Sequence, residues 1–155
     1  MAQWYRVFST AENPPDPDDL LRPLLSHFPR LKARFLGSRE AWLRGEFTVQ
    51  PDCPMIELER YLTEEDDLSA DLQSWAAWLE TCEDEPHSAA LMQHVIATRQ
   101  LFTILVDEPY ADINEEFART LASLLAQATN GVFQSDGLGF FAGSGELLVP
   151  ESPAP

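Results

Sequence analysis

The sequence predicts an α+β fold, an antiparallel or mixed sheet with its helices layered on one face. Segments in which every second residue is apolar, as in strands, are interspersed with segments whose apolar residues recur at helical spacing. The expected order of elements is β-α-β-β-β-α-α-β-α-β-β. This order is compatible with a duplicated ferredoxin-like arrangement, although the two halves share no visible sequence identity.

Length and composition favour a single α+β domain over residues 1–149. A chain of 155 residues that is 45% hydrophobic can bury a proper core. Three prolines lie in residues 150–155, which we expect to be a disordered tail. No leader-like segment and no run of about 18 apolar residues is visible. We therefore expect a protein that does not enter a membrane. Two cysteines are too few for a disulfide framework, which favours the cytoplasm.

The first elements are a short strand at residues 4–9 and a capped helix. Asp16 is a good N-cap, and Pro17 suits the first helical position because its missing amide proton is not needed there. Pro23 would shorten or kink this helix, which we expect to end near residues 27–29.

Three strand-like segments follow at residues 31–36, 42–49 and 55–62. Each alternates apolar with polar residues, which predicts a sheet with one face in water. Basic and acidic side chains can pair across neighbouring strands on that face. The residues that the second and third segments are expected to place there are Trp42, Arg44, Glu46, Thr48, Glu57, Glu59 and Tyr61.

The middle of the chain predicts two helices in tandem. Residues 63–80 and 87–99 each carry an apolar stripe at helical spacing. Glu64 and Glu65 would lie at the start of the first helix, where the helix dipole favours negative charge.

The best-determined stretch runs from residue 101 to residue 149. Residues 101–106 are continuously apolar, which predicts a central strand covered on both faces. A helix over residues 112–128 follows, with Asp112 and Glu115 in capping-box spacing. Glycine-containing turns then separate three short strands.

The net charge of −16 is located in one part of the chain. Residues 1–52 hold seven acids and seven bases, whereas residues 53–155 hold nineteen acids and three arginines. This distribution disfavours nucleic acid and anionic lipid as partners, because both are negatively charged. A basic protein partner is the expectation. The candidate acidic interaction surface is Glu64, Glu65, Asp66, Asp67 and Asp71.

No catalytic, metal or cofactor motif is present. The three histidines lack a second ligand at zinc-site spacing, and the acidic run lacks the glycine and alternating ligands of an EF-hand loop. We therefore expect no catalytic residue, no metal and no cofactor. Stacking and charge on the water face of the sheet, with a histidine from the second tandem helix, suggest a small set of binding residues. They are Trp42, Arg44, Glu57, Glu59, Tyr61 and His94.

Three functional hypotheses follow from these observations. The leading one is a non-catalytic protein-binding or regulatory module that acts through an acidic surface. The second is an enzyme or small-ligand binder whose pocket is assembled from distant residues. The third is a structural homo-oligomer that uses a sheet edge as its interface.

Overall fold

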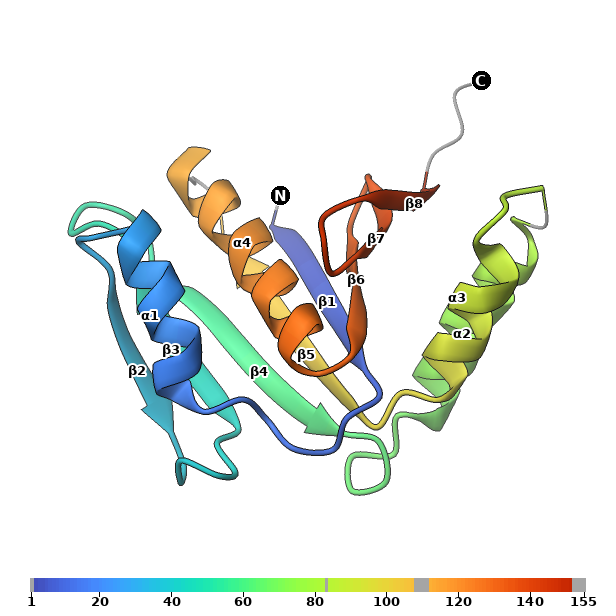
Figure 1. The fold of residues 1–155 in the computed structure, drawn as a ribbon, viewed down its shortest axis with the longest axis horizontal. Coiled ribbons are helices and arrows are strands. Elements are labelled where there is room, and N and C mark those ends of the chain that lie inside the picture. The colour runs from blue at the N-terminus through green and yellow to red at the C-terminus, as the bar shows by residue number, and fades with distance from the viewer. Residues whose placement is uncertain (1, 83, 108–111, 152–155) are drawn as a thin grey trace.

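The computed structural model describes residues 2–82, 84–107 and 112–151, and its centre is one sheet. The eight strands have the order β2-β3-β4-β5-β1-β6-β7-β8, and every neighbouring pair is antiparallel (Figure 1). The α+β class is as predicted. The strands are β1 (Gln3–Ser9), β2 (Lys32–Leu36), β3 (Arg44–Thr48), β4 (Ile56–Leu62), β5 (Gln100–Val106), β6 (Gly131–Ser135), β7 (Gly139–Ala142) and β8 (Leu147–Pro150).

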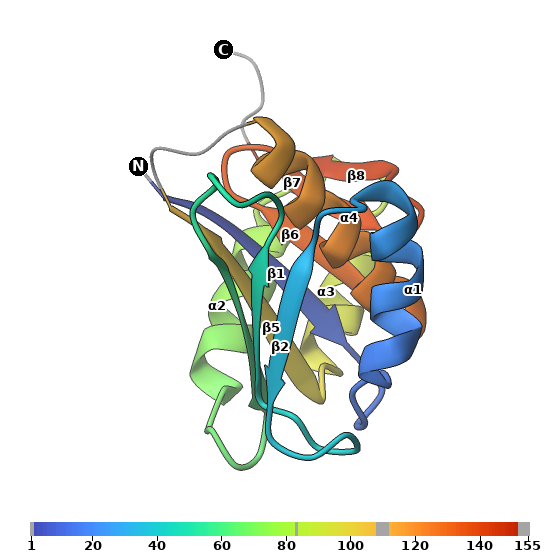
Figure 2. The same ribbon diagram turned by 90° about the vertical axis from the view of Figure 1, so that its left-hand side faces the viewer.

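Helices cover both faces of the sheet, which corrects the prediction that they lie on one face. Figures 1 and 2 show α1 and α4 side by side on one face, with the α2–α3 pair on the opposite face. The helices are α1 (Pro17–His27), α2 (Ser69–Glu80), α3 (Ser88–Ile96) and α4 (Asp112–Ala128). None of these helices is long and apolar enough to cross a membrane in the described parts of the chain.

The larger core lies between the sheet and the helices α1 and α4. Phe117 of α4 meets Phe28 at 5.3 Å and Phe47 at 5.2 Å between ring centroids. Alternate residues of the central strands, such as Val7 and Ile104, are fully buried beneath these rings. The helix predicted over residues 112–128 is confirmed as α4, and its buried residues recur at helical spacing, as in an amphipathic helix.

The smaller core lies under the α2–α3 pair. Phe140 of β7 is its centre, and the rings of Phe8, Trp75 and Trp78 surround it at centroid distances of 5.7 to 5.8 Å. Leu72 and Leu79 from α2 complete the contact with the sheet. The pair packs on Phe8 of β1, Leu101 of β5, Phe140 of β7 and Val149 of β8. The polar side chains of β3 and β4 on the same face, such as Glu46 and Glu57, stay partly exposed, and we call this region the open part of the sheet.

The central position predicted for residues 101–106 is confirmed. β5 pairs with β4 on one side and with β1 on the other. Both β1 and β5 are followed by a helix and a three-strand meander, but the two meanders join the sheet in opposite order. The first joins through its last strand, β4, and the second through its first strand, β6. The duplicated ferredoxin-like arrangement is therefore not confirmed.

Local signals near the N-terminus predicted the first helix well. Asp16 caps α1 by accepting a hydrogen bond from the backbone N–H of Asp18 at 2.8 Å, and this bond lowers the pKa of its carboxyl group. The helix continues through Pro23 to His27.

Three other local predictions are corrected. Trp42 precedes β3 instead of lying on its water face. The α2 helix begins at Ser69, so the acidic run lies in the preceding turn. Pro150 ends β8, and the carboxylate of Glu151 accepts a hydrogen bond from Gln134 at 3.1 Å, so the tail starts later than residue 150. The rest of the predicted tail, residues 152–155, lies outside the described residues.

Candidate functional site

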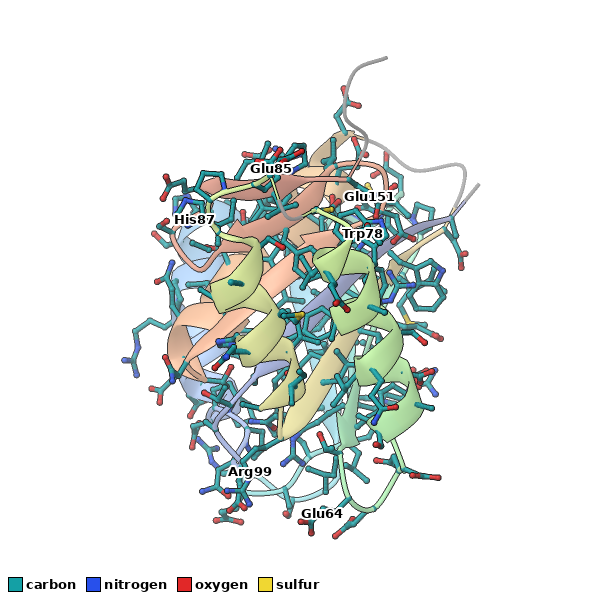
Figure 3. The ribbon with its side chains drawn as sticks, turned by 90° about the vertical axis from the view of Figure 1, so that its right-hand side faces the viewer. Glu64, Trp78, Glu85, His87, Arg99 and Glu151 are labelled. Carbon is teal, nitrogen blue, oxygen red and sulfur yellow. The ribbon has the colours of Figure 1, made fainter. Side chains whose placement is uncertain are left out.

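The turn between β4 and α2 presents the predicted acidic surface to solvent. Glu64, Glu65, Asp66 and Asp67 are all exposed, as is Asp71 in the first turn of α2. The Asp66 carboxylate accepts the backbone N–H of Leu62 at 2.7 Å, which holds the turn together. Figure 3 shows Glu64 at one end of the helix pair. We call these five acids the acidic turn.

The acidic turn has no cationic neighbours on its own segment. Residues 63–98 contain nine acids and no lysine or arginine. Across the described part of the chain, every ion pair involves other carboxylates, from Glu12 and Asp16 to Asp136. The negative charge of the acidic turn is therefore available to a partner.

A cleft of about 400 Å³ lies beside the acidic turn, between α2 and the open part of the sheet. Its floor comes from β1, β4 and β5, and its wall is the first part of α2. We call it the α2 cleft. The lining residues are Trp4, Arg6, Tyr61, Leu68, Asp71, Trp75, Leu101 and Thr103.

Two tryptophans hold an arginine in this cleft. The guanidinium carbon of Arg6 lies 5.2 Å from the ring centroid of Trp75 and 5.9 Å from that of Trp4. Both distances lie within the range of a cation–π interaction. Arg6 also donates to the carboxylate of Asp136 at 2.6 Å and to the side-chain oxygen of Gln134 at 2.8 Å. Its charge is therefore neutralised within the fold.

Tyr61 and Glu59 form a hydrogen-bonded pair on the sheet side of the cleft. The Tyr61 hydroxyl donates to the Glu59 carboxylate, and this bond together with burial raises the pKa of Tyr61 to about 12. The phenol thus stays protonated at neutral pH. Together, these groups give the cleft aromatic faces, a phenol and one carboxylate, that of Asp71 on its wall.

The six predicted binding residues do not form one site. Arg44 and Glu59 face each other in the β3–β4 register, and Arg44 donates to Glu57 at 2.7 Å. Trp42 instead lies in the larger core with none of its surface exposed, and its indole N–H donates to the carbonyl of Pro15 at 2.9 Å. His94 on α3 hydrogen-bonds the carbonyl of Phe8 at 2.9 Å.

The prediction for Trp42 was wrong because this residue lies in the loop before β3. Alternation assigned Trp42 to the same face as Arg44, but strand geometry begins only at Arg44. Because Trp42 lies outside the strand, its ring can pack against those of Phe35 and Phe102, at centroid distances of 5.0 Å and 5.7 Å. Burying an indole among aromatic rings is favourable, whereas the water face would leave it in solvent.

A second cavity, of about 510 Å³, opens where the loop after β1 meets the turn after β4. Arg60 lies at its base with 7% of its surface exposed, and burial lowers the pKa of its guanidinium. Arg99 pairs with Glu12 at the rim. Figure 3 shows Arg99 near Glu64 at this end of the molecule. Since Glu12, Glu64 and Glu65 also line the cavity, the arginines there already have acidic neighbours.

Sequence patterns assigned only Tyr61 and Asp71 of the α2 cleft to a binding surface, and the polar and aromatic residues that they missed are Trp4, Arg6, Trp75 and Thr103. They come from β1, α2 and β5, which are separated by many residues and meet only through the strand pairing. One signal was available, because Trp4 and Arg6 alternate with the apolar Tyr5 and Val7. That alternation indicated that Trp4 and Arg6 share one face of the sheet, but it could not show that α2 packs over that face.

No group of three or more metal-binding side chains occurs within residues 2–82, 84–107 and 112–151. Nε2 of His94 is engaged with the backbone carbonyl of Phe8. Comparison of the chain with protein-family models, curated proteins and solved structures finds no match.

Proposed function

We propose that this protein is a non-catalytic binding module that recognises a basic protein partner through the acidic turn. The observation that carries the proposal is the segregation of charge. Residues 63–98 have nine acids and no lysine or arginine, and the five carboxylates of the acidic turn are exposed without internal ion pairs in the described structure.

Several bases of the chain pair with carboxylates outside the acidic turn, while Arg60 and Arg99 lie beside Glu64 and Glu65 at the second cavity. Arg34 lies 3.2 Å from Glu46, and Arg44 lies 2.7 Å from Glu57, on the open part of the sheet. Arg39 pairs with Asp16 at 2.8 Å near the start of α1. A partner approaching the α2 side therefore meets exposed carboxylates on a segment, residues 63–98, that has no lysine or arginine, which favours fast association with a positive surface.

The experiment measures association of a labelled peptide in which arginine alternates with glycine. The Debye length falls from about 10 Å at 0.1 M salt to about 3 Å at 1 M, so the association rate should fall steeply over this range. A variant that neutralises the turn with isosteric residues should associate about tenfold more slowly at low salt. The substitutions are Glu64→Gln, Glu65→Gln, Asp66→Asn and Asp67→Asn.

These amides keep the turn intact. Asn at position 66 retains an oxygen that can accept the Leu62 N–H, and Asn tolerates the positive φ of 50° observed at Asp67. Unchanged circular dichroism would confirm that the variant is folded.

A matched control separates a specific surface from net charge alone. Four exposed acids lie elsewhere on the chain, and their isosteric neutralisation changes the net charge by the same amount. Equal slowing in both variants would mean that only the overall charge acts, which would refute the proposal. The control substitutions are Glu40→Gln, Asp52→Asn, Glu116→Gln and Glu146→Gln.

A further inference from the structure

We propose that the α2 cleft binds an arginine side chain of the basic partner. This inference rests on the proposed function and names the contact that would follow electrostatic encounter. The acidic turn has charge but no apolar surface of its own, so it can steer a partner without anchoring it. The α2 cleft adjoins the turn and supplies the aromatic surface that the turn lacks.

The cleft has the groups that recognise a guanidinium. Asp71 lines its wall and forms no ion pair in the described structure. Carboxylates can bind a guanidinium with two parallel hydrogen bonds, and aromatic faces can stack on its plane. The rings of Tyr61 and Trp75 line the same space.

The fold itself provides a precedent for this chemistry. Arg6 lies against Trp75 at 5.2 Å and against Trp4 at 5.9 Å, so these indoles already accept a guanidinium. The charge of Arg6 does not oppose a second cation strongly, because Asp136 lies 2.6 Å from it. The other charged residue of the lining is Asp71, whose carboxylate is negative.

Arginine fits the cleft better than lysine. A guanidinium is planar and weakly hydrated, so it can leave water for an aromatic surface, whereas an ammonium group is a strongly hydrated point charge. An anionic or neutral aromatic ligand would leave the Asp71 carboxylate without a partner. The cleft volume of about 400 Å³ is sufficient for one side chain and its backbone.

The test uses the four tryptophans as reporters in protein labelled with ¹⁵N-tryptophan. Trp4 and Trp75 line the cleft, whereas Trp42 lies in the larger core and Trp78 stacks on Phe140. The probes are two peptides of equal length and charge, one alternating arginine with glycine and the other lysine with glycine. We expect the arginine peptide to shift the indole N–H signals of Trp4 and Trp75 and to leave the signal of Trp42 unchanged. The lysine peptide should bind more weakly.

A pair of single variants adds a second measurement. Asp71→Asn should weaken binding of the arginine peptide about fivefold, as expected for loss of one partly exposed ion pair. Glu80→Gln is the matched control, because Glu80 is an exposed acid on the same helix and does not line the cleft. Both residues are exposed, so neither change should affect folding.

The outcomes separate this inference from the proposed function. Binding that remains salt-dependent but shifts neither Trp4 nor Trp75, with Asp71→Asn equal to Glu80→Gln, would overturn the cleft and leave the acidic turn standing. Equal affinity for the two peptides would also overturn it. If neither peptide binds at low salt, both the cleft and the acidic-turn proposals are wrong.

Discussion

Arg60 and Gln100 form a buried hydrogen bond in which the Nε of Arg60 donates to the Oε1 of Gln100 at 2.6 Å. The amide of Gln100 in turn donates to the carbonyls of Ala11 and Asn13 at 2.8 and 2.9 Å. Arg60 also donates to the carbonyl of Glu12 at 2.9 Å. Arg60 of β4 and Gln100 of β5 thus hold the loop after β1 in place by hydrogen bonds to the three consecutive carbonyls of residues 11–13.

Replacing either member of this pair should destabilise the protein. Gln100→Leu removes an acceptor from a buried cation, and Arg60→Met removes the donors of backbone carbonyls, so each should cost about 1–3 kcal/mol or more. The double variant should lose less than the sum, with a coupling free energy of about 0.5–3 kcal/mol. Urea unfolding of the four proteins measures this coupling, and strictly additive losses would contradict it.

Leu121→Ala should lower the free energy of unfolding by about 2–5 kcal/mol, because it leaves a cavity in the larger core. Leu121 on α4 is fully buried. The matched control is Leu25→Ala on α1, where the side chain is 43% exposed and the loss should stay below about 0.5 kcal/mol. Similar urea midpoints for the two variants would show that the helix stripe has been assigned wrongly.

Gly139→Ala should disrupt the pairing of β7 with β8. Gly139 has φ of 129°, and a Cβ atom there would lie 2.1 Å from the carbonyl oxygen of Val149. The strain and the clash together should cost at least about 2 kcal/mol. Gly137→Ala is the control, since its φ of 82° is also positive but nothing lies within 4 Å. That change should cost only about 1–2 kcal/mol, and a thermal melt that fails to rank the two variants in this order would count against the register.

The phenol of Tyr61 should titrate with a pKa of about 12, against an ordinary value of 10.0. Because the folded state holds this proton more tightly than the unfolded chain, the stabilisation is complete below pH 10.0 and is lost as the pH rises towards 12. Glu59→Gln should move the pKa of Tyr61 back towards 10.0, since the carboxylate is the main cause of the shift.

The measurement is the ultraviolet absorbance of the phenolate as the pH is raised. Subtracting the titration of Tyr61→Phe isolates the signal of Tyr61 from those of the other two tyrosines, Tyr5 and Tyr110. A Tyr61 midpoint that Glu59→Gln leaves unchanged would mean that burial alone, and not the hydrogen bond, perturbs the phenol.

Elements whose signals are local could be predicted from the sequence. The N-cap of Asp16 depends on neighbouring residues alone, and the apolar run of residues 101–106 predicted a central strand. Cover on both faces is incomplete, because Thr103 and Leu105 are only half-buried. The concentration of acids in residues 63–98 is likewise a property of the sequence. The acids of residues 64–67 are exposed in the turn before α2, as they would also have been in the first turn of the predicted helix.

Only the tertiary structure decided how those elements meet. An apolar stripe shows which side of a helix is buried but not which face of a sheet it covers, so α2 and α3 could occupy the face opposite α1 and α4. The α2 cleft depends on the β1–β5 and β4–β5 registers, which bring Trp4, Tyr61 and Thr103 together from distant parts of the chain. Such pairings are set by long-range packing of the whole chain, which periodicity within one segment does not encode.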